Sequence, residues 1–203
     1  MINKNLKVKI LEIRGSWESV YRACLNTVGK ERLDTMPSET WKRKIILSEH
    51  SPIRKLSIGA KFYDLFYWVC GHFVRHKIGV EHFVSTQRQD RTGVDRGKNP
   101  QESPVDYELD ANIQALITMS RKRCCYQASP ETREAWNLFL NELKETEPEI
   151  VACCVKECVY RNGLCPEFKC CGYNKSKQFE EELKEYTKFV TEQINPKTNI
   201  HLK

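Results

Sequence analysis

The chain has 203 residues, of which 40% are hydrophobic, with a formal net charge of +6. This length suits one domain, and the hydrophobic fraction is sufficient for a core. No stretch approaches the ~20 apolar residues of a membrane-spanning helix, and the first five residues lack the charged-then-apolar order of a signal peptide. We therefore expect a cytoplasmic protein with no membrane partner.

The basic residues are dispersed along the chain and form no tail of five or more like charges. This distribution suits an anionic ligand of nucleotide size better than a long polyanion. We therefore do not expect nucleic acid as the main partner.

Hydrophobic periodicity and end signals predict two strands and three helices in the first part of the chain. The residue before Pro52 disfavours helical geometry and ends the second helix, and Gly79 is a suitable stop for the third. We expect, in order, a strand at 7–13, a helix starting after Ser16, a helix starting at Pro37, a strand at 54–62 and a helix at 63–77.

The second part of the chain reads as a loop followed by helices. Pro130 in a first turn after Ser129 starts one of these helices. We expect a loop at 90–106, helices at 109–126, 130–143 and 149–159, an irregular segment at 161–174 and an amphipathic helix at 178–194. These elements predict a single α+β domain, with a small sheet packed against helices. We assign 1–148 to the core and 149–203 to a helical, Cys-rich C-terminal extension of the same domain.

The most informative stretch is Arg75-His76-Lys77, followed by seven residues and Ser85, with Arg88 shortly after. Neighbouring helical residues point about 100° apart, so the three basic residues can contact different parts of an extended ligand or two adjacent ligands. Ser85 and Arg88 offer a hydroxyl and a guanidinium to a phosphate. A solvated basic helix end followed by an edge strand is the simpler alternative.

Two further blocks accompany this basic motif. His50 precedes it, between a predicted helix and the strand that leads to the motif. Asn112 and Arg123 follow it, three helical turns apart on one predicted helix, so they would share a face. Three blocks in this order favour a ligand site over an accidental run of charge.

Together the blocks resemble the pattern of flavin-dependent thymidylate synthases, whose signature is Arg-His-Arg, seven residues and Ser. The resemblance extends from His50 to Arg133. It implies the same α+β fold and an enzyme that converts dUMP to dTMP, with methylenetetrahydrofolate as carbon donor, NADPH as reductant and FAD as carrier. It also implies a homotetramer whose active sites are assembled from several subunits.

The resemblance further implies roles for individual residues. It assigns FAD binding to His50, Arg75, His76, Lys77 and Asn112. It assigns nucleotide binding to His72, Ser85, Arg88 and Arg123. Arg123 and Arg75 are the catalytic candidates, because a fixed guanidinium stabilises the negative charge that develops on the pyrimidine carbonyl oxygens.

The chain departs from this pattern around the nucleotide rather than around the flavin. Lys77 replaces the third Arg, His82 and Phe83 replace an Asn-Glu pair, and Arg88 is displaced by one position. The region between Arg88 and Asn112 is also short. Two alternatives therefore stay open: a relative that transfers a one-carbon unit to another pyrimidine nucleotide, and a nucleotide-binding protein without catalysis.

Six of the ten cysteines lie between Cys153 and Cys171. In a cytosolic chain such a cluster favours metal binding over disulfides. We expect zinc or an iron–sulfur cluster on Cys154, Cys158, Cys165 and Cys171. Buried structural thiols and disulfides are the alternatives for this segment. A metal-bearing nucleic-acid binder that uses the basic residues 121–123 ranks last among the functions.

Overall fold

The centre of the computed structural model, which describes residues 3–31 and 36–193, is a four-stranded sheet. Its order is β1-β2-β4-β3, and each neighbouring pair is antiparallel. The strands are β1 (Lys7–Arg14), β2 (Ser57–Phe66), β3 (Val80–Val84) and β4 (Pro104–Asn112). β4 therefore lies between β2 and β3, so the strand that follows the basic motif pairs with the strand that leads to Asn112.

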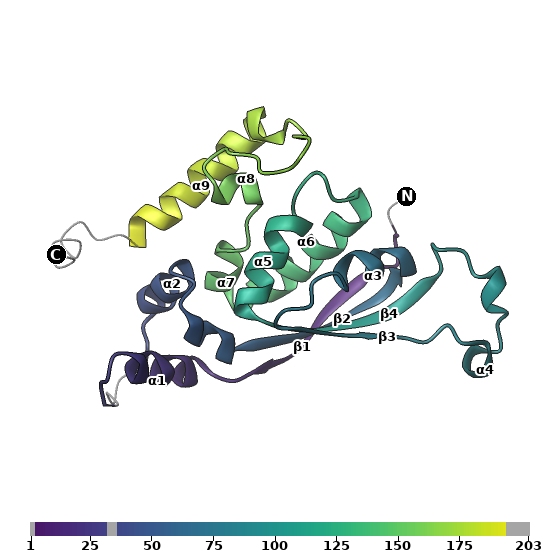
Figure 1. The fold of residues 1–203 in the computed structure, drawn as a ribbon, viewed down its shortest axis with the longest axis horizontal. Coiled ribbons are helices and arrows are strands. Elements are labelled where there is room, and N and C mark those ends of the chain that lie inside the picture. Colours follow the sequence, from purple (N-terminus) through teal and green to yellow (C-terminus); the bar gives the residue numbers. More distant parts are fainter. Residues whose placement is uncertain (1–2, 32–35, 194–203) are drawn as a thin grey trace.

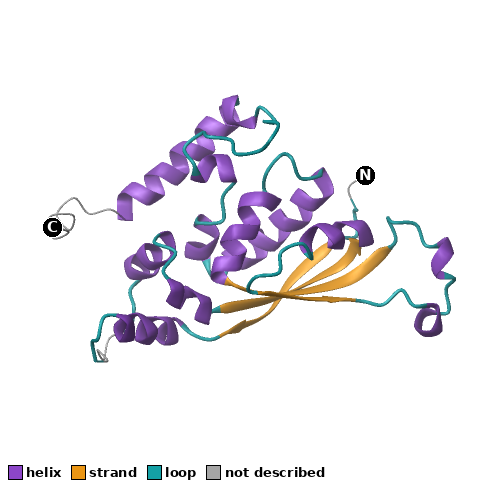
Figure 2. Ribbon diagram, viewed as in Figure 1, coloured by secondary structure: helices purple, strands orange, loops and turns teal. Residues whose placement is uncertain are grey.

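The helices gather on one face of this sheet, with α5 and α6 above its middle and α3 beside them (Figures 1 and 2). The helices of the described residues are α1 (Trp17–Thr27), α2 (Glu39–Leu47), α3 (Tyr67–Phe73), α4 (Gln89–Thr92), α5 (Ile113–Arg123), α6 (Pro130–Lys144), α7 (Pro148–Ala152), α8 (Glu157–Tyr160) and α9 (Lys177–Gln193). None of them combines the length and the apolar character that a membrane crossing requires, within the described ranges.

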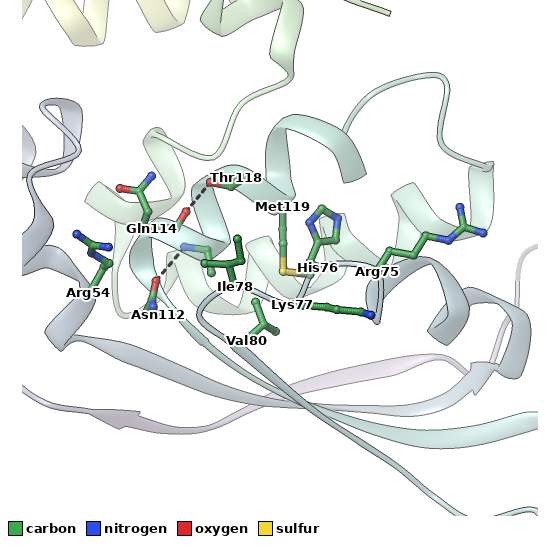
Figure 3. A pocket seen from close by; sticks show the side chains of 11 residues that line it. Arg54, Arg75, His76, Lys77, Ile78, Val80, Asn112, Gln114, Thr118 and Met119 are labelled. Carbon is green, nitrogen blue, oxygen red and sulfur yellow. Dashed lines mark hydrogen bonds between the residues drawn. The ribbon is translucent and has the colours of Figure 1, made fainter.

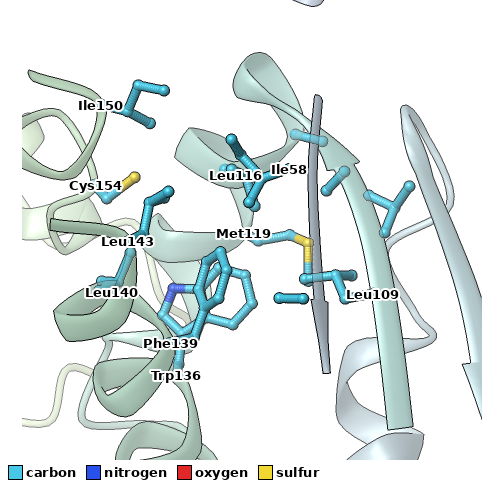
Figure 4. Close-up of a cluster of buried hydrophobic side chains, with 14 of the residues drawn as sticks. Ile58, Leu109, Leu116, Met119, Trp136, Phe139, Leu140, Leu143, Ile150 and Cys154 are labelled. Carbon is cyan, nitrogen blue, oxygen red and sulfur yellow. The ribbon is translucent and has the colours of Figure 1, made fainter. Parts of the chain in front are cut away.

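The main core lies between the sheet and the pair α5–α6 (Figure 4). Alternate β4 residues, among them Leu109, point to this side, because strand side chains alternate between faces. Met119 of α5 and Trp136 and Phe139 of α6 meet them and are almost fully buried. The Trp136 indole donates to Ser120 Oγ across 2.9 Å, so its buried N–H is satisfied. Each buried large side chain contributes roughly 1.5–3 kcal/mol.

The opposite face of the sheet is polar. Lys61 pairs with Asp106 at 3.0 Å, and Arg14 pairs with Asp110. These residues alternate with the buried ones along the same strands, as expected for an antiparallel sheet covered on one side. The α+β prediction, with a small sheet packed against helices, is confirmed, whereas the division of the chain at 148/149 stays a prediction.

Two element predictions were wrong at the sheet. The predicted helix at 109–126 begins only at Ile113, because β4 continues through Asn112 in pairing with β2 and β3. The predicted helix at 63–77 begins at Tyr67, because β2 continues to Phe66 past an irregularity that contains Asp64 with φ 56°. It also ends at Phe73, so Arg75, His76 and Lys77 follow the helix instead of forming its last turn. The strand predicted at 54–62 starts at Ser57, after a 3-10 helix.

The C-terminal region agrees with prediction except at 149–159. That segment is two short helices, α7 and α8, with a break between them rather than one helix. The segment 161–174 is irregular apart from the start of a short 3-10 turn at Tyr173, and α9 follows as predicted. Ile194, the last residue of the predicted helix, lies outside the described residues.

Candidate functional site

A cavity of about 430 Å³ lies between the basic motif and the first turns of α5 (Figure 3). Cationic and amide side chains surround an apolar part formed largely by Ile78, Val80 and Met119. The lining consists of Arg54, Arg75, His76, Lys77, Ile78, Val80, Asn112, Gln114, Ala115, Thr118 and Met119. Four of the residues predicted from sequence to hold a flavin thus share one cavity: Arg75, His76, Lys77 and Asn112.

Sheet pairing brings the two motifs together. Val80 of β3 is opposite Ala111 of β4, and the Asn112 N–H donates to the Gly79 carbonyl across 3.0 Å. Gly79 has φ +73°, a conformation that glycine adopts without strain. A Cβ atom at this position would overlap the Asn112 side-chain amide. The turn after the basic motif therefore requires glycine for two independent reasons.

Asn112 lies before α5 as its N-cap rather than within it. Its Oδ1 accepts the Ala115 N–H at 3.0 Å, which satisfies one of the unpaired donors of the first turn. Gln114 and Ala115, from this turn, line the cavity. The cavity therefore opens onto the positive end of an eleven-residue helix, which favours an anionic group there.

His76 connects the basic motif to the other end of α5. Arg123 Nε donates to His76 Nε2 across 2.8 Å. Burial, followed by the nearby Arg123 cation, lowers the pKa of His76 to about 4. The imidazole is therefore neutral at pH 7, with Nε2 as the acceptor. Burial, and then Arg75, also lower the pKa of Arg123.

His82 stabilises the backbone of the same turn. It donates from Nε2 to the His76 carbonyl at 2.6 Å, and its Nδ1 pairs with the Tyr107 hydroxyl at 2.7 Å. Tyr107 is fully buried in the core. His82, which departs from the family pattern, therefore links the turn after the basic motif to the sheet.

His72 lies on the side of α3 that faces α6. Its Nδ1 pairs with Thr132 Oγ1 at 2.8 Å, and its ring packs edge-on against Trp68. Burial, followed by the Arg123 and Arg75 charges, lowers its pKa. His72 does not line the cavity, but it is close enough to both arginines to sense their charge.

Arg123 does not line the cavity either, although it contacts His76, which does, and three further predicted site residues lie outside the cavity. His50 Nδ1 is 3.9 Å from Cys24 Sγ. Ser85 Oγ accepts the Asp106 N–H at 3.0 Å, and Arg88 forms two 2.9 Å hydrogen bonds with the carboxylate of Asp90. Ser85 and Arg88 lead into the segment with α4, which projects from the body of the protein (Figure 1).

Sequence reasoning missed Arg54 and Gln114, which both line the cavity. Arg54 belongs to the 3-10 helix Ser51–Lys55, which is anchored beside α5 by the Ile113 N–H donating to the Leu56 carbonyl at 3.1 Å. Gln114 donates to Glu49 Oε2 at 2.6 Å. The position of Gln114 two residues after Asn112 was the only available signal.

The predicted metal ligands are divided between two places. Cys158, Cys165 and Cys171 line one small cavity, together with Cys125 and Cys170. Cys154 is buried elsewhere, close to Ser120. All ten cysteines are unpaired thiols. Within the described residues, no three His, Cys, Asp or Glu side chains have metal-binding geometry as they stand.

The fold is that of the flavin-dependent thymidylate synthases. A UMP/dUMP methylase, PolB from Streptomyces cacaoi bound with 5-Br dUMP, superposes with a TM-score of 0.58 and 12% identity over 75% of this chain and 95% of that one. Thymidylate Synthase X (ThyX) from Helicobacter pylori, with FAD and dUMP, gives 0.57 and 12% identity over 74% of this chain and 99% of that one. By sequence alone, no family profile and no curated protein matches the chain.

Proposed function

We propose that this protein is a flavin-dependent enzyme that reductively methylates dUMP to dTMP, with methylenetetrahydrofolate as carbon donor and NADPH as reductant. The observation that carries the proposal is the convergence of Arg75, His76, Lys77 and Asn112 on one cavity at the start of α5. The fold shared with two nucleotide-bound enzymes supports it.

The residues around the cavity fit FAD. Its volume of about 430 Å³ lies within the usual range for ligand sites. Ile78, which is exposed, offers apolar surface to a planar ring, and Arg54 and Lys77 offer positive charge to phosphates. Asn112 and His50 are the further candidates for flavin binding. When bound, FAD would supply the electrons that reduce the transferred carbon.

Arg123 is the proposed group that stabilises charge on the pyrimidine. Its Nε is engaged by His76 at 2.8 Å, which orients the guanidinium while leaving its terminal nitrogens for a ligand. A guanidinium oriented in advance stabilises the charge that develops on the carbonyl oxygens of the base. Arg75, whose charge acts on both Arg123 and His72, is the second catalytic candidate.

The nucleotide phosphate is assigned to Ser85 and Arg88, and His72 completes the proposed nucleotide set. Ser85 and Arg88 are exposed and lie away from the cavity of their own chain. Phe83 and Val94, in the same part of the chain, are exposed apolar residues. We propose a homotetramer in which this segment reaches the cavity of a neighbouring subunit.

The first test combines cofactor and turnover. We expect the purified protein to bind FAD, and to release tritium from 5-tritiated dUMP when NADPH and methylenetetrahydrofolate are supplied. Arg123→Lys should keep the flavin but lower kcat by about 10²–10³-fold. Arg161→Lys is the matched control, because Arg161 is exposed and neither it nor its ion-pair partner Glu157 lines this cavity. Absence of both flavin binding and tritium release would refute the proposal.

The same assay separates the alternatives. The likeness to a UMP/dUMP methylase favours testing UMP beside dUMP as the second candidate substrate. Turnover of UMP in place of dUMP would assign the chain to methylation of another pyrimidine nucleotide. Flavin and nucleotide binding without turnover of either would leave a binding protein without catalysis.

A further inference from the structure

A second, small cavity lies where the end of α5, the helix α8 and the loop before α9 meet. Five cysteines from these three segments line it: Cys125, Cys158, Cys165, Cys170 and Cys171. Its enclosed volume is about 10 Å³, close to the size of a single water molecule or ion. The proposed catalytic function uses none of these residues.

Three of the five sulfur atoms are associated with a backbone N–H two residues further along the chain. The Gly172 N–H donates to Cys170 Sγ at 3.4 Å. The backbone N–H groups of Gln127 and Glu167 likewise form hydrogen bonds with the sulfur atoms of Cys125 and Cys165. Hydrogen bonds from outer groups to ligand atoms are what orients metal-binding side chains. This repeated arrangement therefore fits thiolates that bind a cation.

The loop between α8 and α9 has little apolar burial of its own. Leu164 is 73% exposed and Phe168 is fully exposed. Beneath the loop, Cys158 forms a small core with Val159, Tyr173 and Phe179, separate from the main core. Segments without a sufficient core commonly depend on a metal or a disulfide for stability. A cross-link at the cysteines would supply this stability.

We propose that Cys125, Cys158, Cys165 and one of the adjacent pair Cys170–Cys171 bind a single Zn²⁺ ion. The ion would join the end of α5, α8 and the loop. Each thiol releases its proton to solvent as its sulfur binds the metal. Because the sulfurs do not yet stand in metal-binding geometry, the loop moves inward until each Zn–S distance reaches about 2.3 Å. Cys125, from outside the sequence cluster, takes the place that spacing alone gave to Cys154.

The test is the zinc content of the full chain purified anaerobically. We expect about one zinc per chain in the wild type, by the one-ion stoichiometry of a four-thiolate site. Cys125→Ser, Cys165→Ser and the double variant Cys170→Ser/Cys171→Ser should each lose it. Cys154→Ser is the matched control, a buried cysteine that does not line the cavity, and it should keep the zinc.

A second measurement covers variants that fail to fold. Wild-type protein, stripped by a chelator and titrated with Co²⁺, should take up one ion and develop the thiolate-to-cobalt absorption of a tetrahedral site. Four outcomes would overturn the proposal: no bound metal, zinc retained in every cavity variant, iron with inorganic sulfide in place of zinc, or disulfides among these cysteines under anaerobic conditions.

Discussion

Arg123 Nε donates to His76 Nε2 across 2.8 Å, and this hydrogen bond joins two motifs that are 47 positions apart in the sequence. It requires a neutral imidazole, because a protonated ring has no acceptor and carries the same charge as the guanidinium. The low pKa of His76, about 4, agrees with this requirement. The relation makes the orientation of Arg123 dependent on the protonation state of His76.

The first prediction concerns pH and stability. His76 has a folded pKa of about 4 against an ordinary value of 6.5, so between these values the unfolded chain binds more protons. The contribution of neutral His76 to the stability of the folded protein is therefore fully present above pH 6.5, and it is lost as the pH falls toward 4. Thermal unfolding across this window should show a steeper loss for the wild type than for His76→Gln. An equal dependence of thermal stability on pH in the two proteins would contradict the low pKa of His76. His72, whose pKa is also lowered, is present in both proteins and contributes equally to each.

The second prediction separates the two roles of Asn112. Asn112→Ala removes the N-cap of α5 and should lower the free energy of unfolding by about 1 kcal/mol. Asn112→Asp keeps a good cap but replaces the side-chain amide with a carboxylate at the cavity wall. We expect it to retain stability in urea titrations and to weaken FAD binding measured by flavin fluorescence. Unchanged flavin affinity in the Asp variant would remove Asn112 from the proposed flavin site.

An element could be predicted from the sequence where the residues that determine its conformation are close neighbours in the chain. The strand at 7–13 and the helix starting at Pro130 were predicted because alternation and an N-terminal Ser-Pro pair are readable within a few residues. The segment 109–112 was misassigned to a helix because its strand conformation depends on pairing with β2 and β3. That pairing joins residues that are far apart in the sequence, so no local window contains it.

The same distinction applies to the site. Arg75, His76 and Lys77 could be placed near Asn112 because a family pattern already relates them. Arg54 could not, because only the anchoring of its 3-10 helix beside α5 brings it to the cavity. Similarly, Cys125 joins the C-terminal cysteines through the packing of α5 against α8, which sequence spacing does not encode.

The third prediction concerns the turn after the basic motif. Gly79 and Gly93 have nearly the same left-handed conformation, with φ +73° and +72°. A Cβ atom would overlap the Asn112 amide at Gly79 and would meet open space at Gly93. Gly93→Ala should therefore cost only the conformational strain, about 1 kcal/mol. Gly79→Ala should cost clearly more in urea titrations and also weaken FAD binding; equal losses would mean that the contact with Asn112 is unimportant.

The fourth prediction concerns the support behind the cavity. Glu49 accepts from Gln114 Nε2 at 2.6 Å and pairs with Arg121, whose side chain is only 14% exposed and whose guanidinium lies 3.7 Å from the centre of the Tyr160 ring. Glu49→Gln leaves this largely buried cation without its counter-charge, so we expect a loss of about 1–3 kcal/mol in the free energy of unfolding.

Asp90→Asn is the matched control for Glu49→Gln, because Asp90 pairs with Arg88 where both side chains are more than half exposed. Solvent screens such a pair, so its removal should cost less than about 1 kcal/mol. Because Gln114 lines the cavity and forms a hydrogen bond with Glu49, Glu49→Gln should also weaken FAD binding. A larger stability loss from Asp90→Asn than from Glu49→Gln would show that burial does not determine the strength of these two ion pairs.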